Sequence, residues 1–182
     1  MGGIGSRDRV TVDLPAASPL HALDPHAPAL VVFLRSFGCT FCREALADVA
    51  AVKSNIQSAG AQIAVVHGGS PAEAAPWFAK YGLDDITVIS DPELTHYRAF
   101  GLGRTDAQAL VAPRVWARGA VCALSHGFGV QPVEMLRQLP GVFVIQNGAI
   151  LREFRHRSPA DRPDYLSLVI GAQPAGFKIG QR

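Results

Sequence analysis

The chain has 182 residues, of which 48% are apolar and 18% are charged, and its formal net charge is +2. This composition is typical of one packed globular domain and excludes an intrinsically disordered chain. The basic residues are scattered, so the sequence predicts no nucleic-acid partner. No apolar segment is long enough to cross a bilayer, which predicts no membrane association.

We expect a single domain whose core spans about residues 29–170. Residues 1–8 lack the apolar centre of a signal peptide, and this predicts a cytoplasmic protein. The two ends, residues 1–10 and 172–182, are expected to be flexible. The sequence leaves the oligomeric state open.

The first predicted element is a buried strand within the apolar run of residues 29–34. The motif Cys39-x-x-Cys42 follows it and leads into a segment of helical periodicity, which Gly60 is suited to end. A helix N-terminus carries partial positive charge and unpaired N–H groups, and both stabilise a cysteine there as thiolate. Two cysteines at this spacing can also close a short disulfide ring. The motif therefore predicts a redox-active dithiol at a strand-to-helix turn.

Three cysteines are too few for a disulfide framework, and in a reducing compartment a close pair indicates a metal site or a catalytic dithiol. A zinc site needs about four ligands. The third cysteine, Cys122, and the six histidines are dispersed along the chain, so we predict no metal site. Cys122 is expected to be buried and inert, with a role as alternative resolver left open.

A second strand and helix follow the dithiol helix. Residues 62–67 are branched and apolar, which is typical of a buried parallel strand, and His67 at its end is expected to be packed rather than catalytic. Ser70 and Glu73 predict a capping box for the next helix. This alternation of strands and helices predicts parallel strands joined by right-handed crossovers.

The pattern repeats once and then weakens. Residues 86–90 predict a third strand, and Asp91 predicts the N-cap of a short helix. Residues 102–131 indicate a helical insertion that opens with a capping box at residues 105–108. The helical aromatic residues expected in the core are Trp77, Phe78 and Trp116.

The chain is predicted to end in a hairpin and a helix. Asn147-Gly148 is a strong hairpin signal between strands over residues 142–146 and 149–155. Residues 164–170 then supply a closing helix. The sheet is therefore expected to finish with an antiparallel pair.

Four segments carry a resemblance to a known family, namely residues 33–44, 90–91, 141–148 and 155–165. They are similar to the peroxiredoxin-like branch of the AhpC/TSA family. The resemblance implies a thioredoxin-like α/β fold, a mixed sheet of about five strands with helices on both faces. The helical insertion that the residues indicate is added to this fold. The strand order that we expect across the sheet is 86–90, 62–67, 31–34, 142–146, 149–155.

The resemblance also implies a thiol oxidoreductase that acts on disulfide or peroxide substrates. It needs no bound cofactor, and its electrons come from a transient protein or small-thiol reductant. A rival of a different class is a non-catalytic interaction module that binds a protein partner through residues 102–131. Thiol reactivity separates the two.

Cys39 is the predicted nucleophile because, as the first residue of the motif, it should lie nearer to solvent and to the unpaired N–H groups, with Cys42 as the resolver. Arg43 is a candidate for lowering a cysteine pKa, and Ser36 is a candidate hydrogen-bond donor to the substrate. The alternatives without a function are that Arg43 extends into solvent and that Ser36 is a turn residue.

The chain departs from the Pro-x-x-x-Thr-x-x-Cys signature of typical peroxiredoxins. If Cys39 is the peroxidatic residue, Ser36 takes the threonine position and Val32 the proline position. If it is Cys42, those positions hold Cys39 and Arg35.

A second departure concerns the arginine that peroxiredoxins keep ahead of the hairpin strand. Pro140 stands at about that place and resembles instead the cis-proline that faces the dithiol in thioredoxins. Peroxide is therefore predicted to be a poorer substrate than a disulfide, unless another arginine replaces the missing guanidinium. The candidates for that replacement are Arg35, Arg43, Arg114 and Arg118.

Overall fold

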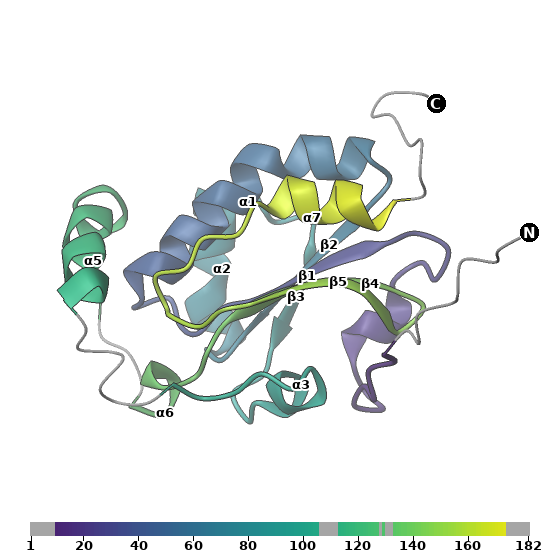
Figure 1. Ribbon diagram of the computed structural model, residues 1–182, viewed down its shortest axis with the longest axis horizontal. Helices are drawn as coiled ribbons and strands as arrows, with labels where there is room; N and C mark the ends of the chain where they lie inside the picture. The colour runs from purple at the N-terminus through teal and green to yellow at the C-terminus, as the bar shows by residue number, and fades with distance from the viewer. Residues whose placement is uncertain (1–9, 106–112, 128, 130–132, 174–182) are drawn as a thin grey trace, which may run out of the picture.

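A computed structural model describes residues 10–105, 113–127, 129 and 133–173. Its centre is a five-stranded mixed sheet in the order β3-β2-β1-β4-β5 (Figure 1). The strands are β1 (Ala29–Phe33), β2 (Gln62–His67), β3 (Thr87–Ser90), β4 (Gly141–Gln146) and β5 (Ala149–Arg155). β1, β2 and β3 run parallel, while β4 is antiparallel to both β1 and β5. The predicted strand order and the thioredoxin-like architecture are confirmed.

Helices cover both faces of the sheet, as predicted (Figure 1). The helical elements are η1 (Pro19–Ala22), α1 (Thr40–Ser58), α2 (Pro71–Lys80), α3 (Thr95–Ala99), α5 (Pro113–His126), α6 (Val133–Leu136) and α7 (Tyr165–Ala172). The helices α1, α2 and α7 contribute to the apolar cluster on one face. The cluster on the other face receives side chains from η1, α3 and α6.

Local sequence signals explain where several elements begin and end. Gly60 follows α1 with φ of 76°, a left-handed conformation that glycine adopts without steric cost. Ser70 and Glu73 form both hydrogen bonds of the capping box at the start of α2. Asn147 and Gly148 have φ of 48° and 74°, as a tight hairpin turn between β4 and β5 requires.

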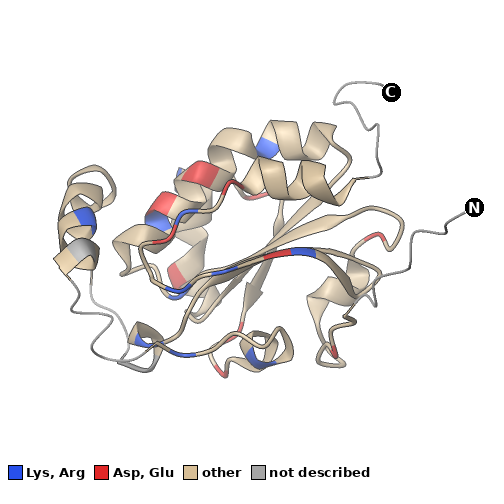
Figure 2. Ribbon diagram, viewed as in Figure 1, with Lys and Arg blue, Asp and Glu red and all other residues tan. Residues whose placement is uncertain are grey.

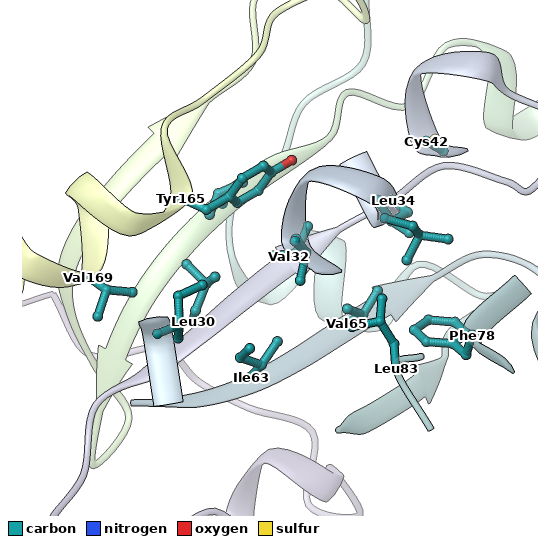
Figure 3. Close-up of a cluster of buried hydrophobic side chains, with 14 of the residues drawn as sticks. Leu30, Val32, Leu34, Cys42, Ile63, Val65, Phe78, Leu83, Tyr165 and Val169 are labelled. Atoms are coloured by element: carbon teal, nitrogen blue, oxygen red, sulfur yellow. The ribbon is translucent and has the colours of Figure 1, made fainter. Parts of the chain in front are cut away.

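The cluster beneath α1 connects the sheet to the dithiol. Leu30, Val32 and Leu34 project to this face because side chains alternate along a strand. Burying each such side chain contributes about 1.5–3 kcal/mol. Figure 3 shows Cys42 and Tyr165 together with these residues, and both are buried members of the same cluster. The second cysteine of the motif is therefore anchored in the hydrophobic core.

The packed core reaches further toward the N-terminus than residue 29. Val12 and Leu20 are buried in the cluster on the second face, and Thr11 forms an isolated bridge with Ala149. Most of the two ends that were expected to be flexible lies outside the described residues.

The described part of the insertion is helical, as predicted, and consists chiefly of α5. Its expected capping box lies outside the described residues apart from Thr105. The prediction that Trp116 is a core residue is wrong, since its side chain is 68% exposed. The reason is that α5 lies beside α1 rather than on the sheet, and it buries Val115 and Cys122 instead (Figure 1).

Charged residues are interspersed over the elements, and α1 and β5 each carry both signs (Figure 2). This distribution agrees with the scattered basic residues of the sequence. Among the described helices, none is both long and apolar enough to cross a bilayer.

Candidate active site

The dithiol lies where β1 passes into α1, as the sequence predicts. Cys39 is the N-cap residue of α1 and has extended backbone angles. Its carbonyl oxygen accepts hydrogen bonds from the N–H groups of Cys42, at 3.1 Å, and Arg43, at 3.2 Å. All three cysteines of the chain are free thiols.

The expectation that Cys39 lies nearer to solvent than Cys42 is wrong. Cys39 is 1% exposed and Cys42 is 4% exposed. Cys39 belongs to the buried core cluster, and the loop that leads to it from β1 is fixed by long-range backbone bonds. The Gly38 carbonyl accepts from the N–H of Gly129 at 3.0 Å, and the Arg35 carbonyl accepts from Gly68 at 3.2 Å.

Arg35 contacts both sulfur atoms. Its Nη2 donates to Cys39 Sγ at 2.9 Å, and its backbone N–H donates to Cys42 Sγ at 3.2 Å. Its Nη1 donates to the carbonyl oxygen of Leu136 in α6 at 2.7 Å, and this bond fixes the guanidinium in place. The side chain is buried, so its charge acts on the sulfur with little screening by water.

The two cysteines have opposite pKa shifts. The Cys42 thiol donates a hydrogen bond to the Cys39 sulfur, and this bond, helped by the charge of Arg35, lowers the pKa of Cys39 to about 5 against the effect of burial. The same bond and burial raise the pKa of Cys42 well above its ordinary value. At neutral pH Cys39 is therefore a thiolate and Cys42 a thiol, a division that suits attack by the first and resolution by the second.

Arg43 contacts neither sulfur. Its Nε donates to the Phe37 carbonyl oxygen at 2.6 Å, and its Nη1 donates to the His126 carbonyl oxygen at 3.1 Å. The guanidinium carbon lies 4.2 Å from the centroid of the Trp77 ring. Arg43 thus ties the dithiol loop to α5 and α2. Ser36 is buried, and its carbonyl oxygen accepts a hydrogen bond from the Cys39 N–H at 3.2 Å.

The prediction of a cis peptide bond before Pro140 is wrong, because the described residues contain no cis peptide bond. An X-Pro bond is trans unless its surroundings impose the other isomer. Here the Leu139 N–H donates to the Gly103 carbonyl at 3.1 Å, and the Pro140 carbonyl accepts from His156 at 3.4 Å. Both bonds are made with the trans peptide. Pro140 nevertheless lines a cavity together with Cys42.

This cavity, of about 20 Å³, lies between the start of α1 and the segment after β5. Its lining includes Cys42, Arg35, His156 and Tyr165. The charged residues in its lining are Glu44, Asp48, Asp161 and Arg162. A void of this size holds about one water molecule.

His67 is packed, as predicted. Its ring centroid lies 4.9 Å from that of Phe37 and 6.2 Å from that of Phe78. Neither ring nitrogen has a hydrogen-bond partner within the described residues, and burial lowers the pKa of His67 to about 4. The imidazole is therefore neutral at physiological pH.

The structure brings Cys122 and His126 closer to an acidic residue than their sequence positions suggest. Their ligand atoms and a carboxylate oxygen of Glu44 all lie within 4.8 Å of one another. Arg118 forms a salt bridge with the Glu44 carboxylate, with Nη2 at 2.7 Å from Oε2. Cys122 is buried, as predicted, and burial raises the pKa of its thiol, which keeps it protonated at neutral pH.

Arg35 and His156 were not among the site residues predicted from the sequence, although Arg35 was one of four candidate substitutes. A signal for Arg35 exists, because a charged residue two positions after the buried strand β1 must find partners in the protein. His156 has no comparable local signal. Its neighbours Arg35 and Cys42 are more than a hundred residues away in the sequence.

The comparison with protein families finds one match. A model described as AhpC/TSA antioxidant enzyme matches residues 48–158, more than half of the chain. The matched span begins after the dithiol. No match was found among curated proteins.

Solved structures include several similar chains. Reduced Prx3 of Vibrio vulnificus in complex with H₂O₂ has 15% sequence identity and a TM-score of 0.59, with 91% of this chain and 94% of that chain covered. The bacterioferritin comigratory protein of Xanthomonas campestris has 21% identity and a TM-score of 0.52, with 81% and 87% covered. Peroxidoxin BcpB of Mycobacterium tuberculosis has 15% identity and a TM-score of 0.50, with 80% and 75% covered. At these identities the likeness shows the fold alone.

Proposed function

Because the chain belongs to the AhpC/TSA antioxidant enzyme family, we propose that it reduces peroxides through the dithiol of Cys39 and Cys42. One observation carries the proposal: the Cys39 sulfur accepts hydrogen bonds from both the Arg35 guanidinium and the Cys42 thiol. The charged donor stabilises the thiolate, and the neighbouring thiol is in place to resolve the oxidised sulfur.

The first step is attack of the Cys39 thiolate on a peroxide oxygen. An S–O bond forms and the O–O bond breaks, so that the sulfur is oxidised to sulfenic acid and the peroxide is reduced to an alcohol or water, which takes one proton from solvent. Negative charge moves from sulfur to the leaving oxygen in this step. Arg35 can stabilise that charge, in the way that preorganised donors act on oxyanions elsewhere.

The second step is attack of Cys42 on the Cys39 sulfur. An S–S bond forms, the S–O bond breaks, and the hydroxide leaves as water with the proton of the Cys42 thiol. Two electrons from a thiol reductant then return the disulfide to the dithiol by thiol-disulfide exchange. We propose a protein or small thiol as this transient partner.

Two features favour a small peroxide over a bulky disulfide. Cys39 is 1% exposed on an anchored loop, and a small oxidant needs less opening of the structure to reach it. The preference for disulfides drawn from the sequence depended on a missing guanidinium. Arg35 supplies a guanidinium at 2.9 Å from the sulfur, which removes the reason for that preference.

A second candidate function is a non-catalytic module that binds a protein partner through the insertion. The observation in its favour is the apolar surface of α5, where Trp116 is 68% exposed and Leu124 is 89% exposed. Such a module has no need of a thiolate. Reactivity of the dithiol therefore distinguishes the two functions.

The test is oxidation of the reduced protein by hydrogen peroxide, followed by alkylation of free thiols and peptide mapping. We expect a Cys39–Cys42 disulfide that a thiol reductant reverses. Cys42→Ser should stop at a sulfenic acid on Cys39, and Cys39→Ser should not react. The proposal is wrong if both cysteines stay alkylatable, or if the bridge that forms involves Cys122.

A further inference from the structure

The small cavity beside Cys42 contains a buried polar group that the mechanism above does not use. His156 is 8% exposed and lines this cavity with Cys42. Its Nδ1 is buried and has no hydrogen-bond partner within the described residues. The ring is held edge-on against Phe154, with centroids 5.1 Å apart. An unpaired buried nitrogen is costly, so its presence beside a thiol that must lose a proton points to a use.

We propose that His156 accepts the proton of Cys42, through one water molecule in the cavity, when Cys42 resolves the oxidised Cys39. This role rests on the proposed function. As the S–S bond forms and the S–O bond breaks, the Cys42 proton passes by way of the water to Nδ1. The imidazolium then returns a proton to the leaving hydroxide, which departs as water, so that His156 ends neutral.

The resolving step needs such an acceptor because Cys42 is buried and its thiol does not ionise readily. Its proton must leave as the sulfur attacks, and Cys42 itself is only 4% exposed. The cavity has room for about one water, which supplies a relay between two groups that line the same void.

The other polar side chains that line the cavity are poor acceptors. Arg35 stays protonated, and burial raises the pKa of Tyr165, so that its hydroxyl stays protonated too. The carboxylates already have partners. Glu44 pairs with Arg118, Asp48 binds Arg162 through both oxygens, and Asp161 accepts from the backbone N–H groups of Arg157 and Ser158. Among the described cavity residues, Nδ1 of His156 is the buried ring nitrogen without a hydrogen-bond partner, and in the neutral ring it accepts a hydrogen bond when the proton is on Nε2.

His156 is in the right protonation state for this role. Burial lowers its pKa to about 4 and the charge of Arg35 acts weakly in the same direction, while the negative charge of Asp161 and hydrogen bonds with the backbone of Asp161 and Pro140 act against it. The ring is therefore neutral from about pH 5 upward. The titratable and charged groups around it are Cys42, Arg35, Glu44, Asp48, Asp161, Arg162 and Tyr165.

The two chemical steps can be followed separately after rapid mixing of the reduced protein with hydrogen peroxide, with acid quench and mass analysis. Sulfenic acid formation depends on peroxide concentration, and its decay to the disulfide does not. In His156→Gln we expect the decay to slow by about tenfold, below the hundredfold of a well-matched base because a base of low pKa is weak. The formation step should change by less than about twofold, since it uses Cys39 and Arg35.

His96→Gln is the matched control. His96 is also buried, but it lies on α3 under the opposite face of the sheet, where its Nε2 contacts Ser18 Oγ at 2.9 Å. This variant should leave both steps unchanged. An unchanged decay in His156→Gln overturns the inference, and so does an equal slowing of both steps, because that result indicates a structural role.

The wild-type protein gives a test that needs no variant. With a neutral imidazole as acceptor, the decay of the sulfenic acid should be independent of pH between about pH 6 and 8 and should fall toward pH 4. A rise of about tenfold per pH unit over that range would show that ionisation of Cys42 controls the step, and would overturn the inference. If no Cys39–Cys42 disulfide forms at all, the proposed function itself has failed, which is a different result.

Discussion

The residues on the two sides of the dithiol differ in chemical character. On one side Phe37 packs against the rings of His67, Trp77 and Phe78, at centroid distances of 4.9 to 6.5 Å. On the other side Cys42 lines a cavity that has charged residues and His156 in its lining, and Nδ1 of His156 is buried without a hydrogen-bond partner. The first side is an aromatic cluster, and the second has room for water.

This difference separates two requirements of dithiol chemistry. The attacking sulfur must be held in one place, which the packed core and the anchored loop achieve, and its charge must be stabilised, which the hydrogen bonds from Cys42 and Arg35 achieve against the effect of burial. The resolving sulfur must lose a proton, which requires polar groups and water within reach. Arg35 lies between the two sides and contacts both sulfurs. The predictions below test this division in order of expected effect.

The largest effect is expected for Arg35→Met. The substitution removes the charged donor from Cys39, so the rate of oxidation by hydrogen peroxide at neutral pH should fall by about a hundredfold or more. The pKa of Cys39 should rise, because the thiolate loses a positive neighbour. Stopped-flow oxidation and pH-dependent alkylation measure the two quantities. A loss of less than about threefold would mean that Arg35 does not stabilise the reacting charge.

The aromatic side should make the protein sensitive to acid. His67 has a folded pKa of about 4, below its ordinary value, so the unfolded chain binds a proton first and stability falls as the pH drops from about 6.5 to 4. At pH 5 the proton bound by His67 in the unfolded chain lowers the free energy of unfolding by about 2 kcal/mol.

His67→Phe tests this cost by removing the titrating group from its aromatic surroundings. Urea unfolding at pH 7 and pH 5 measures the free energy of unfolding. Between these two pH values this free energy should fall by about 2 kcal/mol less in the variant than in the wild-type protein. His21→Gln, at an exposed position, should leave the difference unchanged. An equal loss in His67→Phe and the wild type would contradict a neutral buried imidazole.

Arg43→Met should lower stability rather than thiol acidity. Its guanidinium contacts the Phe37 carbonyl, the His126 carbonyl and the Trp77 ring, and losing these contacts should cost about 1–1.5 kcal/mol of unfolding free energy. The pKa of Cys39 should stay the same, since Arg43 does not contact either sulfur. A rise in that pKa would restore the role for Arg43 predicted from the sequence.

The smallest effect is expected for Cys122→Ser. Cys122 is a protonated thiol bound to the Thr40 carbonyl at 3.6 Å, and the mechanism does not use it. Oxidation by hydrogen peroxide and recovery by a thiol reductant should change by less than about twofold. Loss of the reversible disulfide in this variant would make Cys122 the resolver.

The sequence predicted most of the fold because its signals are local. The apolar run of β1, the capping box of Ser70 and Glu73 and the turn at Asn147-Gly148 each act within a few residues. Their order then left few possible topologies. The exposed face of α5 could not be predicted in this way, since Trp116 has helical spacing and only the position of α5 beside α1 decides its burial.

The site was predicted less completely because its chemistry depends on distant contacts. The position of the dithiol at the start of α1 follows from local patterns. The guanidinium on Cys39 depends on a bond from Arg35 to Leu136, 101 residues further along the chain. The loop that carries Cys39 likewise has a long-range contact, from the Gly129 N–H to the Gly38 carbonyl.

The division of roles between Cys39 and Cys42 is tested most directly by the pH dependence of alkylation. The reduced protein is treated with iodoacetamide across a pH series, and each cysteine is followed by peptide mapping. We predict that Cys39 is modified first, with a half-maximal rate near the pKa of about 5, and that Cys42 reacts slowly throughout. Faster modification of Cys42, or a Cys39 midpoint near the ordinary thiol value of about 8.5, would contradict the account.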